Sequence, residues 1–328
     1  MTNPRICTTI LLNKAYGTFM SPRRITLLAL AAILAATAAC AAEVTVVSNI
    51  LGPEGPLFID GNLYFVGWGS DTLSKWDGKS TTVLNHTPGC GHNGLALTKQ
   101  KTFLLACTND PGAILELDMY GLQLHRWDTD SNGRKLDGGV NDIVVTGSGG
   151  AYATTFGTFA NLATPPAGVT GRILYRAPGG RSWVGVADNL NYANGIGVSP
   201  DQKTLYVSET VGNCILKFNV NANGTLSNRA NFALLNQLAP NAVSSPWLGP
   251  DSMKVDDQGN MYVAQFIGGR ILKISAAGKL LQVFRIAAGS GTTNVAFGPG
   301  GAELYVSVVK DPNDPLFRGR IVKISNAD

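Results

Sequence analysis

The chain has 328 residues, of which 45% are hydrophobic and 15% charged, and its formal net charge is +4. Residues 1–42 contain four bases and no acid, so residues 43–328 are balanced, with 22 bases and 22 acids. The positive charge therefore belongs to the first segment alone, and a basic surface for nucleic acid is not expected. The length that remains is enough for one domain.

The first 42 residues have the three parts of a secretory signal peptide. A pair of arginines precedes an almost wholly apolar run from Ile25 to Ala36, and small residues follow around Cys40. The apolar run is too short to span a bilayer. We predict a leader over residues 1–42, an exported domain over residues 43–328 that is secreted or periplasmic, and no membrane span. Lipid anchoring at Cys40 is disfavoured, because the usual Leu three residues earlier is missing.

Six segments then share one pattern, in which a polar residue is followed by two alternating strands joined by a tight turn. Asn194–Glu209 (NGIGVSPDQKTLYVSE) is a typical copy, and successive copies start 38, 49, 53, 57 and 43 residues apart. A third strand-like segment, such as Arg270–Ile274, usually follows. A period of roughly 40 to 50 residues with about four strands is typical of a propeller blade, so we predict an all-β, six-bladed β-propeller. The copies begin at Glu54, His92, Asn141, Asn194, Asp251 and Asn294.

The two ends of the repeat array predict how the ring closes. After Ile324 too few residues remain for an outermost strand in the last blade, whereas Glu43–Leu51 is strand-like and precedes the first copy. We expect this N-terminal strand to join the last blade, which would leave no open sheet edge.

Three cysteines lie beyond the leader. Cys90 and Cys107 flank one hairpin and could form a disulfide in an oxidising compartment, and Cys214 is expected to be buried beside Ile215. No CxxC pair and no His at ligand spacing accompanies them, which disfavours a zinc site.

The first residue of each copy is expected to point toward the central channel, because the innermost strand of a blade begins there. In the second copy either His92 or the next residue, Asn93, would take this place. Two carboxylates and several carboxamides would then meet on one axis, and such oxygen donors suit a hard divalent cation. A single Asn or Asp at a strand start is often a turn residue that bonds its own backbone, but the shared repeat phase favours a common site.

The same residues carry a resemblance to a known family. The chain resembles the six-bladed calcium-dependent lactonases that group senescence marker protein, gluconolactonase and the luciferin-regenerating enzyme, and more distantly paraoxonase and diisopropylfluorophosphatase. The matching segments follow one another through the predicted domain: Glu54-Gly55-Pro56, Asn141-Asp142, Asn194-Gly195, Asp251 with Gly259–Val263, and Thr292–Gly298.

This resemblance implies a Ca²⁺ ion, or another divalent cation, and a small-molecule lactone or ester as substrate. The ligands it implies are Glu54, Asn194 and Asp251, with Asn141 as a fourth ligand or a substrate contact. Two positions depart from the family pattern. Gly139 stands where sugar-lactone members carry an Arg, which weakens the case for a sugar acid lactone, and Ser252 stands where a Gly usually follows the Asp.

The expected reaction is hydrolysis, in which the cation polarises a carbonyl and water attacks it. Either Asp251 or His92 would take the proton of the water. The resemblance to sugar lactonases favours Asp251, whereas an imidazole with a pKa near 6.5 is chemically the better base than a carboxylate on a cation. His92 could equally be a solvated turn residue in a Gly-rich loop, so both candidates stay open.

Two long, apolar, Pro-containing segments, 154–171 and 236–250, are expected to lie over the site and to set substrate size. Together with Gly139 they favour a substrate less polar than a sugar acid lactone. Four other tryptophans, Trp68, Trp76, Trp127 and Trp183, are expected to pack in or beside blade strands. The predicted substrate contacts are Asn93, Asn294, Phe156 and Trp247, and Phe159 is a further aromatic candidate in the first segment.

Two other functions fit the sequence. A phosphotriesterase-type hydrolase would use the same cation with a phosphoryl oxygen in place of the carbonyl. A non-catalytic binding propeller of the NHL type would share strands such as Gly259–Val263 but would need no acids that converge on the axis.

Overall fold

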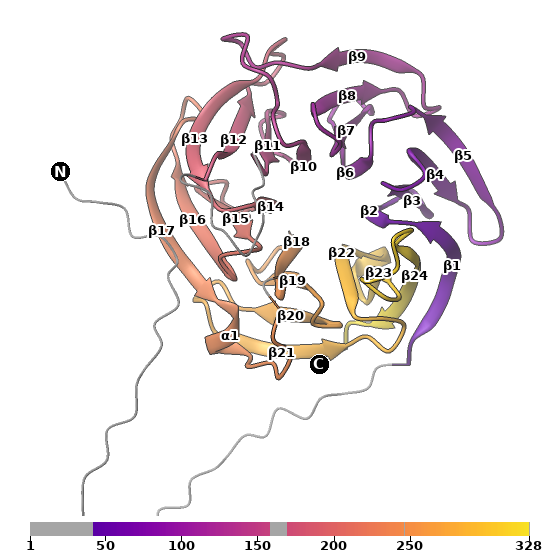
Figure 1. The fold of residues 1–328 in the computed structure, drawn as a ribbon. Helices are drawn as coiled ribbons and strands as arrows, with labels where there is room; N and C mark the ends of the chain where they lie inside the picture. The colour runs from indigo at the N-terminus through magenta and orange to yellow at the C-terminus, as the bar shows by residue number, and fades with distance from the viewer. Residues whose placement is uncertain (1–41, 158–168, 246, 328) are drawn as a thin grey trace, which may run out of the picture.

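A computed structural model describes residues 42–157, 169–245 and 247–327. More than half of these residues lie in strands, helix is confined to two short turns, and the strands form six four-stranded antiparallel sheets arranged in a ring around a central axis (Figure 1). The predicted six-bladed β-propeller is therefore confirmed. The predicted leader, including Cys40, lies outside the described residues.

The first three blades run from residue 53 to residue 190, and in each the strands follow chain order from the channel outward. The first blade contains β2 (Pro53–Ile59), β3 (Asn62–Gly67), β4 (Thr72–Trp76) and β5 (Thr81–His86). The second contains β6 (His92–Leu97), β7 (Phe103–Cys107), β8 (Ala113–Leu117) and β9 (Gln123–Trp127). The third contains β10 (Val140–Val145), β11 (Ala151–Thr155), β12 (Gly171–Arg176) and β13 (Val184–Leu190).

The next two blades repeat this order. The fourth contains β14 (Ala193–Val198), β15 (Thr204–Glu209), β16 (Cys214–Val220) and β17 (Leu226–Leu234). A short helix, α1 (Leu235–Leu238), follows it within a segment for which the sequence had indicated only a loop. The fifth contains β18 (Gly249–Val255), β19 (Met261–Phe266), β20 (Arg270–Ile274) and β21 (Leu280–Arg285).

The sixth blade joins the two ends of the chain. Its inner strands are β22 (Gly291–Phe297), β23 (Glu303–Val309) and β24 (Arg318–Ser325), with a 3-10 turn at Pro299–Gly301. Its outermost strand is β1 (Val44–Leu51), which pairs antiparallel with β24. The predicted closure by the N-terminal strand is thus confirmed.

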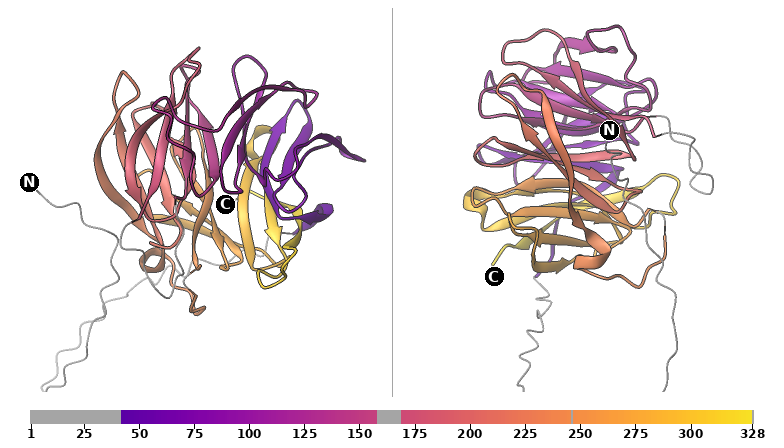
Figure 2. Two further views of the ribbon diagram at one scale, coloured as in Figure 1. Left: turned by 45° about the horizontal axis from the view of Figure 1, so that its top comes forward. Right: turned by 90° about the vertical axis from the view of Figure 1, so that its left-hand side faces the viewer.

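The core consists of the interfaces between blades, because the middle strands are buried on both faces. Along β7 the side chains alternate between two apolar clusters. Phe103 and Leu105 pack with the first blade, whereas Leu104 and Ala106 pack with the third. Because successive side chains of a strand point to opposite faces, β7 packs against both neighbouring blades. Both of its faces are therefore buried, and its sequence is apolar throughout. Figure 2 shows the blades as neighbouring twisted sheets in two further views.

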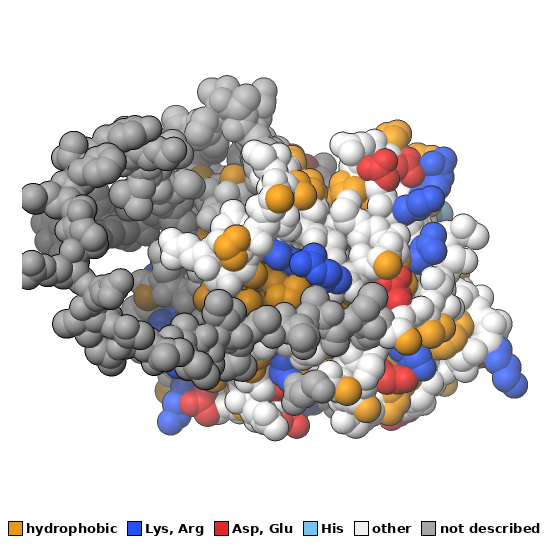
Figure 3. Space-filling model, turned by 90° about the horizontal axis from the view of Figure 1, so that it is seen from below, with side chains coloured by type: hydrophobic (Ala, Val, Ile, Leu, Met, Phe, Trp, Pro, Cys, Tyr) orange, Lys and Arg blue, Asp and Glu red, His pale blue; other side chains and the backbone are white. Residues whose placement is uncertain are grey.

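Other features of the described residues bear on the sequence predictions. Cys90 and Cys107 form a disulfide, and Cys214 is fully buried. Acidic and basic side chains are interspersed on the face shown in Figure 3. Among helices within these residues, none has the length and hydropathy needed to cross a membrane.

The ring closure predicts a measurable stability effect. Ile50 on β1 is 7% exposed and packs in one cluster with side chains of the first and sixth blades. Replacing it in the variant Ile50→Ala should lower the free energy of unfolding by about 2–4 kcal/mol, because the truncation leaves a cavity at the seam. Denaturant unfolding measures this loss. Val44→Ala on the same strand, where the side chain is 51% exposed, is the control and should change stability little; equal effects would contradict a tightly packed seam.

Candidate functional site

The innermost strand of each blade has an irregularity where the polar residue of the repeat falls. In the fourth blade Ala193 pairs with Glu209 and Ile196 with Val207, so that Asn194 and Gly195 stand opposite one residue. Such a β-bulge bends the strand and re-aims side chains. The other five innermost strands shift register at the corresponding place. In four blades the polar residue lies within the shift, whereas Glu54 immediately precedes it in the first blade and Asn294 immediately follows it in the sixth.

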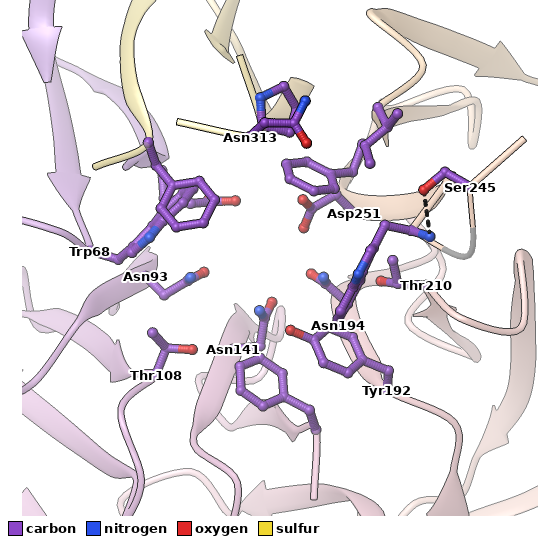
Figure 4. Close-up of a pocket in the computed structure, with 17 residues that line it drawn as sticks. Trp68, Asn93, Thr108, Asn141, Tyr192, Asn194, Thr210, Ser245, Asp251 and Asn313 are labelled. Carbon is purple, nitrogen blue, oxygen red and sulfur yellow. Dashed lines mark hydrogen bonds between the residues drawn. The ribbon is translucent and has the colours of Figure 1, made fainter. Parts of the chain in front are cut away.

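Five of these polar side chains line one cavity of about 500 Å³. Figure 4 shows the polar ends of Asn93, Asn141, Asn194 and Asp251 directed toward its middle from separate blades. The fifth is Glu54 of the first blade. The predicted metal-ligand residues are thus brought together, and Asn93, predicted as a substrate contact, lies among them.

Glycine follows the polar residue in three blades because neighbouring innermost strands approach closely there. A Cβ added at Gly55 would lie 2.6 Å from the carbonyl oxygen of Asn93, and one added at Gly94 would lie 2.7 Å from that of Asn141. A Cβ at Gly195 would overlap the carbonyl oxygen of Asp251. The missing side chains let the hub contract until the polar side chains can reach one another.

Glu54 is a buried carboxylate held in a fixed orientation. One of its oxygens, Oε2, accepts hydrogen bonds from the backbone N–H of Gly55 and from the side-chain amide of Asn294, both at 2.6 Å. Burial raises the pKa of Glu54 from 4.5 to about 7, and the negative charge of Asp142 adds to the rise, whereas these two hydrogen bonds and Lys254 oppose it.

Asp251 is the second buried carboxylate of the cavity. Burial raises its pKa well above the ordinary value, and the charges of Glu54 and Asp142 raise it further. The carboxamide of Asn194 and the backbone of Ser252 only partly offset this. Three acidic side chains thus repel one another at the hub.

The carboxamides supply a second indication that a ligand belongs here. The Oδ1 atoms of Asn93, Asn141 and Asn194 are buried and have no hydrogen-bond partner among the described residues. Buried polar atoms are nearly always satisfied, so three orphaned oxygens beside two carboxylates form an incomplete coordination shell. A cation that prefers oxygen, such as Ca²⁺, fits this donor set. Because no three His, Cys, Asp or Glu side chains of the described chain are placed so that they could hold a metal ion together, the fit depends on the carboxamides.

His92 occupies a different environment. Its side chain is fully buried and does not line the cavity, whereas the next residue along β6, Asn93, does. Burial lowers the pKa of His92 to about 4, although the nearby backbone of Thr72 and the charge of Asp71 oppose this. Of the two candidate bases, only Asp251 faces the cavity.

The other predicted substrate contacts divide in the same way. Phe156 and Trp247 line the cavity. Asn294 does not line it: its side chain is fully buried and donates to Glu54, because it lies one position beyond the bulge. Asn294 is therefore a positioning residue for the carboxylate. Phe159 lies outside the described residues.

Sequence reasoning missed much of the aromatic wall. Tyr192, Phe266 and Phe317 also line the cavity, as does Trp68, for which only packing was expected. Packing does describe Trp76, Trp127 and Trp183, which contact apolar clusters between blades. A usable signal for Tyr192 was its place two residues before the polar residue of its repeat; Phe317 lies in a turn, where the repeat pattern gives no phase.

Gly139 leaves no room for a long side chain at its position. Its φ is +91°, a Cβ there would overlap the carbonyl oxygen of Thr108, and the ring of Phe156 would lie only 3.1 Å from that Cβ. An aromatic ring therefore packs beside the backbone at the position where the sequence lacks a cationic side chain.

A comparison with protein families agrees with the repeat and its polar residues. The model of the SMP-30/Gluconolactonase/LRE-like region matches residues 52–310. The chain belongs to this family. The match extends from the first strand of the first blade to the end of β23, so that all six bulges fall inside the family region.

Curated relatives of this family member include staphylococcal proteins named lactonase drp35. That of Staphylococcus saprophyticus is 30% identical over 186 residues, which make up 53% of this chain and 52% of the relative. That of Staphylococcus aureus strain MW2 is 30% identical over 144 residues, or 42% of this chain and 39% of the relative. The chain spans about half or less of the length of these relatives.

Solved structures share the fold over almost their whole length. A gluconolactonase from Xanthomonas campestris matches with a TM-score of 0.69 and 24% identity, over 93% of this chain and 95% of that one. A calcium-binding protein, regucalcin, from Agrobacterium tumefaciens matches with a TM-score of 0.66 and 20% identity, over 84% and 90%. At these identities the structural matches establish the propeller fold alone.

The close approach at the hub predicts the effect of one added methyl group. Gly195→Ala should push the backbone of Asp251 outward, because real Cβ atoms do not approach a carbonyl oxygen so closely. We expect a loss of about 1–3 kcal/mol in the free energy of unfolding together with weakened cation binding, measured by denaturant unfolding and calorimetry. Gly185→Ala on β13, where an added Cβ would meet nothing within 4 Å, is the matched control. Full stability and affinity in Gly195→Ala would contradict the contracted hub.

The buried carboxylates predict a pH effect in protein treated with a chelator. The folded pKa of Glu54, about 7, lies above its ordinary 4.5, so the folded state holds an extra proton between these values. The free energy of unfolding should therefore fall, by roughly 3 kcal/mol, as pH rises from about 4.5 to 7. Denaturant unfolding at several pH values measures it. Glu54→Gln should flatten this part of the profile; an unchanged slope would show that Glu54 is not responsible.

Proposed function

We propose that the protein is an exported, Ca²⁺-dependent hydrolase that opens a lactone or ester. The observation that carries this proposal is the group of two buried carboxylates and three unpartnered carboxamide oxygens in one cavity. Membership of the gluconolactonase-like family and the names of the lactonase relatives support the choice of reaction. The neighbour described as calcium-binding supports the choice of cation.

Two kinds of residue would hold the cation. They are the carboxamides whose buried oxygens have no hydrogen-bond partner among the described residues, and the buried carboxylates whose negative charges repel one another. Glu54 and Asp251 would balance the two positive charges of Ca²⁺, and further coordination positions would be left for water and substrate. When bound there, the ion supplies Lewis-acid polarisation of a carbonyl oxygen. The proposed ligands are Glu54, Asn141, Asn194 and Asp251, with the oxygen of Asn93 as an additional donor.

Asp251 is the proposed proton acceptor. Its carboxylate would take the proton of the water that adds to the carbonyl carbon, and would return it to the ring oxygen as the C–O bond breaks. The proton taken from the water thus ends on the leaving oxygen, and Asp251 returns to its starting protonation state. Its position supports this role, because Asp251 lines the cavity, whereas the other candidate base does not. His92 is not part of the proposal, since its side chain does not line the cavity.

Asn294 would support the reaction indirectly. Its amide group holds Oε2 of Glu54 in place, and its own Oδ1 accepts a hydrogen bond from the backbone N–H of Val295 at 2.8 Å. This chain of bonds fixes the amide orientation, so the carboxylate is preorganised before a ligand arrives.

Export is the part of the proposal that rests mainly on residues 1–42. Their signal-peptide pattern supports it, and the disulfide between Cys90 and Cys107 is compatible with an oxidising compartment. The non-catalytic binding propeller is the weaker alternative. A propeller that binds its partner without a cation has no need of buried carboxylates that repel one another.

The metal mechanism predicts a joint loss of binding and activity. Treatment with EDTA should abolish hydrolysis of lactones, and added Ca²⁺ should restore it. Asp251→Ala and Glu54→Ala should each lower kcat/KM by about a hundredfold or more, because each removes a ligand and a charge. Activity assays and calcium calorimetry measure the two effects. Asp257→Ala, which removes an exposed carboxylate of the same blade, should behave as the unmodified protein.

Two results would contradict the proposal. Full lactonase activity of the Asp251→Ala and Glu54→Ala proteins after EDTA treatment would exclude the metal mechanism. Absence of a tight calcium site would favour the binding propeller, and higher rates on a phosphotriester than on any lactone would favour the phosphotriesterase alternative.

A further inference from the structure

The cavity wall around the proposed cation site is aromatic on two sides. On one side Phe156 and Tyr192 are stacked, with ring centroids 4.7 Å apart and planes at 9°, and Trp247 meets Tyr192 edge-on at 5.2 Å. On the other side Trp68 and Phe317 contact each other at 5.5 Å. Figure 4 shows Trp68 and Tyr192 on opposite sides of the polar cluster. The space above the oxygens therefore lies between two aromatic walls.

The backbone under these walls is strained at three places. Tyr192, Ile267 and Phe317 have φ values of +58°, +61° and +47°, in the left-handed region that bulky side chains rarely adopt. The other non-glycine residues with positive φ in the described chain are all Asn, Asp, Lys or Gln, the types common in turns. All three bulky exceptions line the cavity. Strained backbone of this kind persists only where the surrounding structure holds the residue in place. Such residues cluster at active sites and ligand-binding sites, so their position here indicates a ligand site.

Local contacts hold the strained rings in place. The backbone N–H of Phe317 donates to the carbonyl of Asp314 at 2.8 Å, and the carbonyl of Phe317 accepts from Gly52 at 2.9 Å. Gly52 has a φ of +63°, and a Cβ there would overlap the ring of Trp68. The glycine thus lets the Trp68 ring lie against the backbone beside Phe317. Backbone hydrogen bonds and close packing therefore hold this wall in the ligand-free protein.

The charge of the wall limits the ligand further. Among the described residues that line the cavity there is no Lys, Arg or His, and its charged groups are Glu54 and Asp251 alone. A free carboxylate on the substrate would meet no cationic side chain. Beyond the oxygen cluster the polar groups of the lining include the hydroxyl of Tyr192 and the side chains of Thr108, Thr210, Ser245 and Asn313 (Figure 4).

We propose that the substrate is an uncharged lactone or ester that carries a planar aromatic ring, which binds between the Trp68–Phe317 pair and the Phe156–Tyr192–Trp247 group while its carbonyl faces the oxygen cluster. This inference rests on the proposed function and names its substrate class. Rings held between aromatic side chains gain offset-stacked and edge contacts that a saturated or polyhydroxylated group lacks. A polyol would also lose water from those hydroxyl groups that lie against the ring faces, where no polar atom replaces it.

The test compares three δ-lactones of similar size: one fused to a benzene ring, its saturated bicyclic analogue and a polyhydroxylated one. We expect kcat/KM for the benzo-fused lactone to exceed that for the other two by about tenfold or more, since each aromatic contact contributes about threefold to tenfold. Phe317→Leu and Trp247→Leu, in separate loops, stay apolar but remove a ring and should each reduce this preference several-fold. Leu316→Ala, next to Phe317 and 47% exposed, is the control and should keep it.

A binding measurement separates this inference from the reaction itself. A benzo-fused lactam, which resists hydrolysis, is titrated into protein treated with a chelator and into protein with Ca²⁺, with tryptophan fluorescence as readout. Lactam binding that weakens in Phe317→Leu supports the aromatic walls, even if no lactone is hydrolysed and the hydrolase proposal fails. Equal or faster hydrolysis of the polyhydroxylated lactone overturns the substrate class while the hydrolase proposal stands. Absence of lactam binding overturns the inference whatever the activity.

Discussion

Mutual repulsion of buried negative charge at the hub is the constraint on which the site depends. Glu54 and Asp251 are almost completely buried in one cavity, Asp142 lies close enough to raise both of their pKa values, and Lys254 is the base whose charge opposes this at Glu54. Such an arrangement is unfavourable on its own, because burial and like charge both oppose ionisation. A divalent cation would remove the conflict, and it would also satisfy the carboxamide oxygens that have no partner among the described residues.

The propeller makes this arrangement possible by dividing the work between strands. The middle strands of each blade are apolar on both faces and hold neighbouring blades together, so the scaffold is rigid without help from the hub. The innermost strands can then carry a β-bulge and a polar residue at the same height. Glycines after the polar residue in three blades bring these strands into close contact. The polar and glycine positions, which are unfavourable in a regular strand, are therefore those that form the site.

Above the oxygens, the described lining of the cavity has strained backbone and no charged side chain. Three bulky residues at positive φ hold the walls, and Gly139 and Gly52 let the rings of Phe156 and Trp68 lie against the backbone. In physical terms the site combines a hard, polar floor with rigid apolar sides. A ligand that suits both halves has one polarisable carbonyl and one flat apolar group.

The sequence by itself determined the fold and the identity of most hub residues. A repeated polar residue before an apolar strand fixes both the blade and the phase, so Glu54, Asn141, Asn194 and Asp251 could be predicted to meet, and the strand-like segment before the first copy predicted the closure. Only the tertiary structure decided which of two adjacent side chains faces the cavity. The bulge shifts register, so Asn93 rather than His92 faces the cavity and Asn294 turns to Glu54. The aromatic wall comes from turns and loops of different blades, whose positions are set by packing between distant segments and leave no periodic trace in the chain.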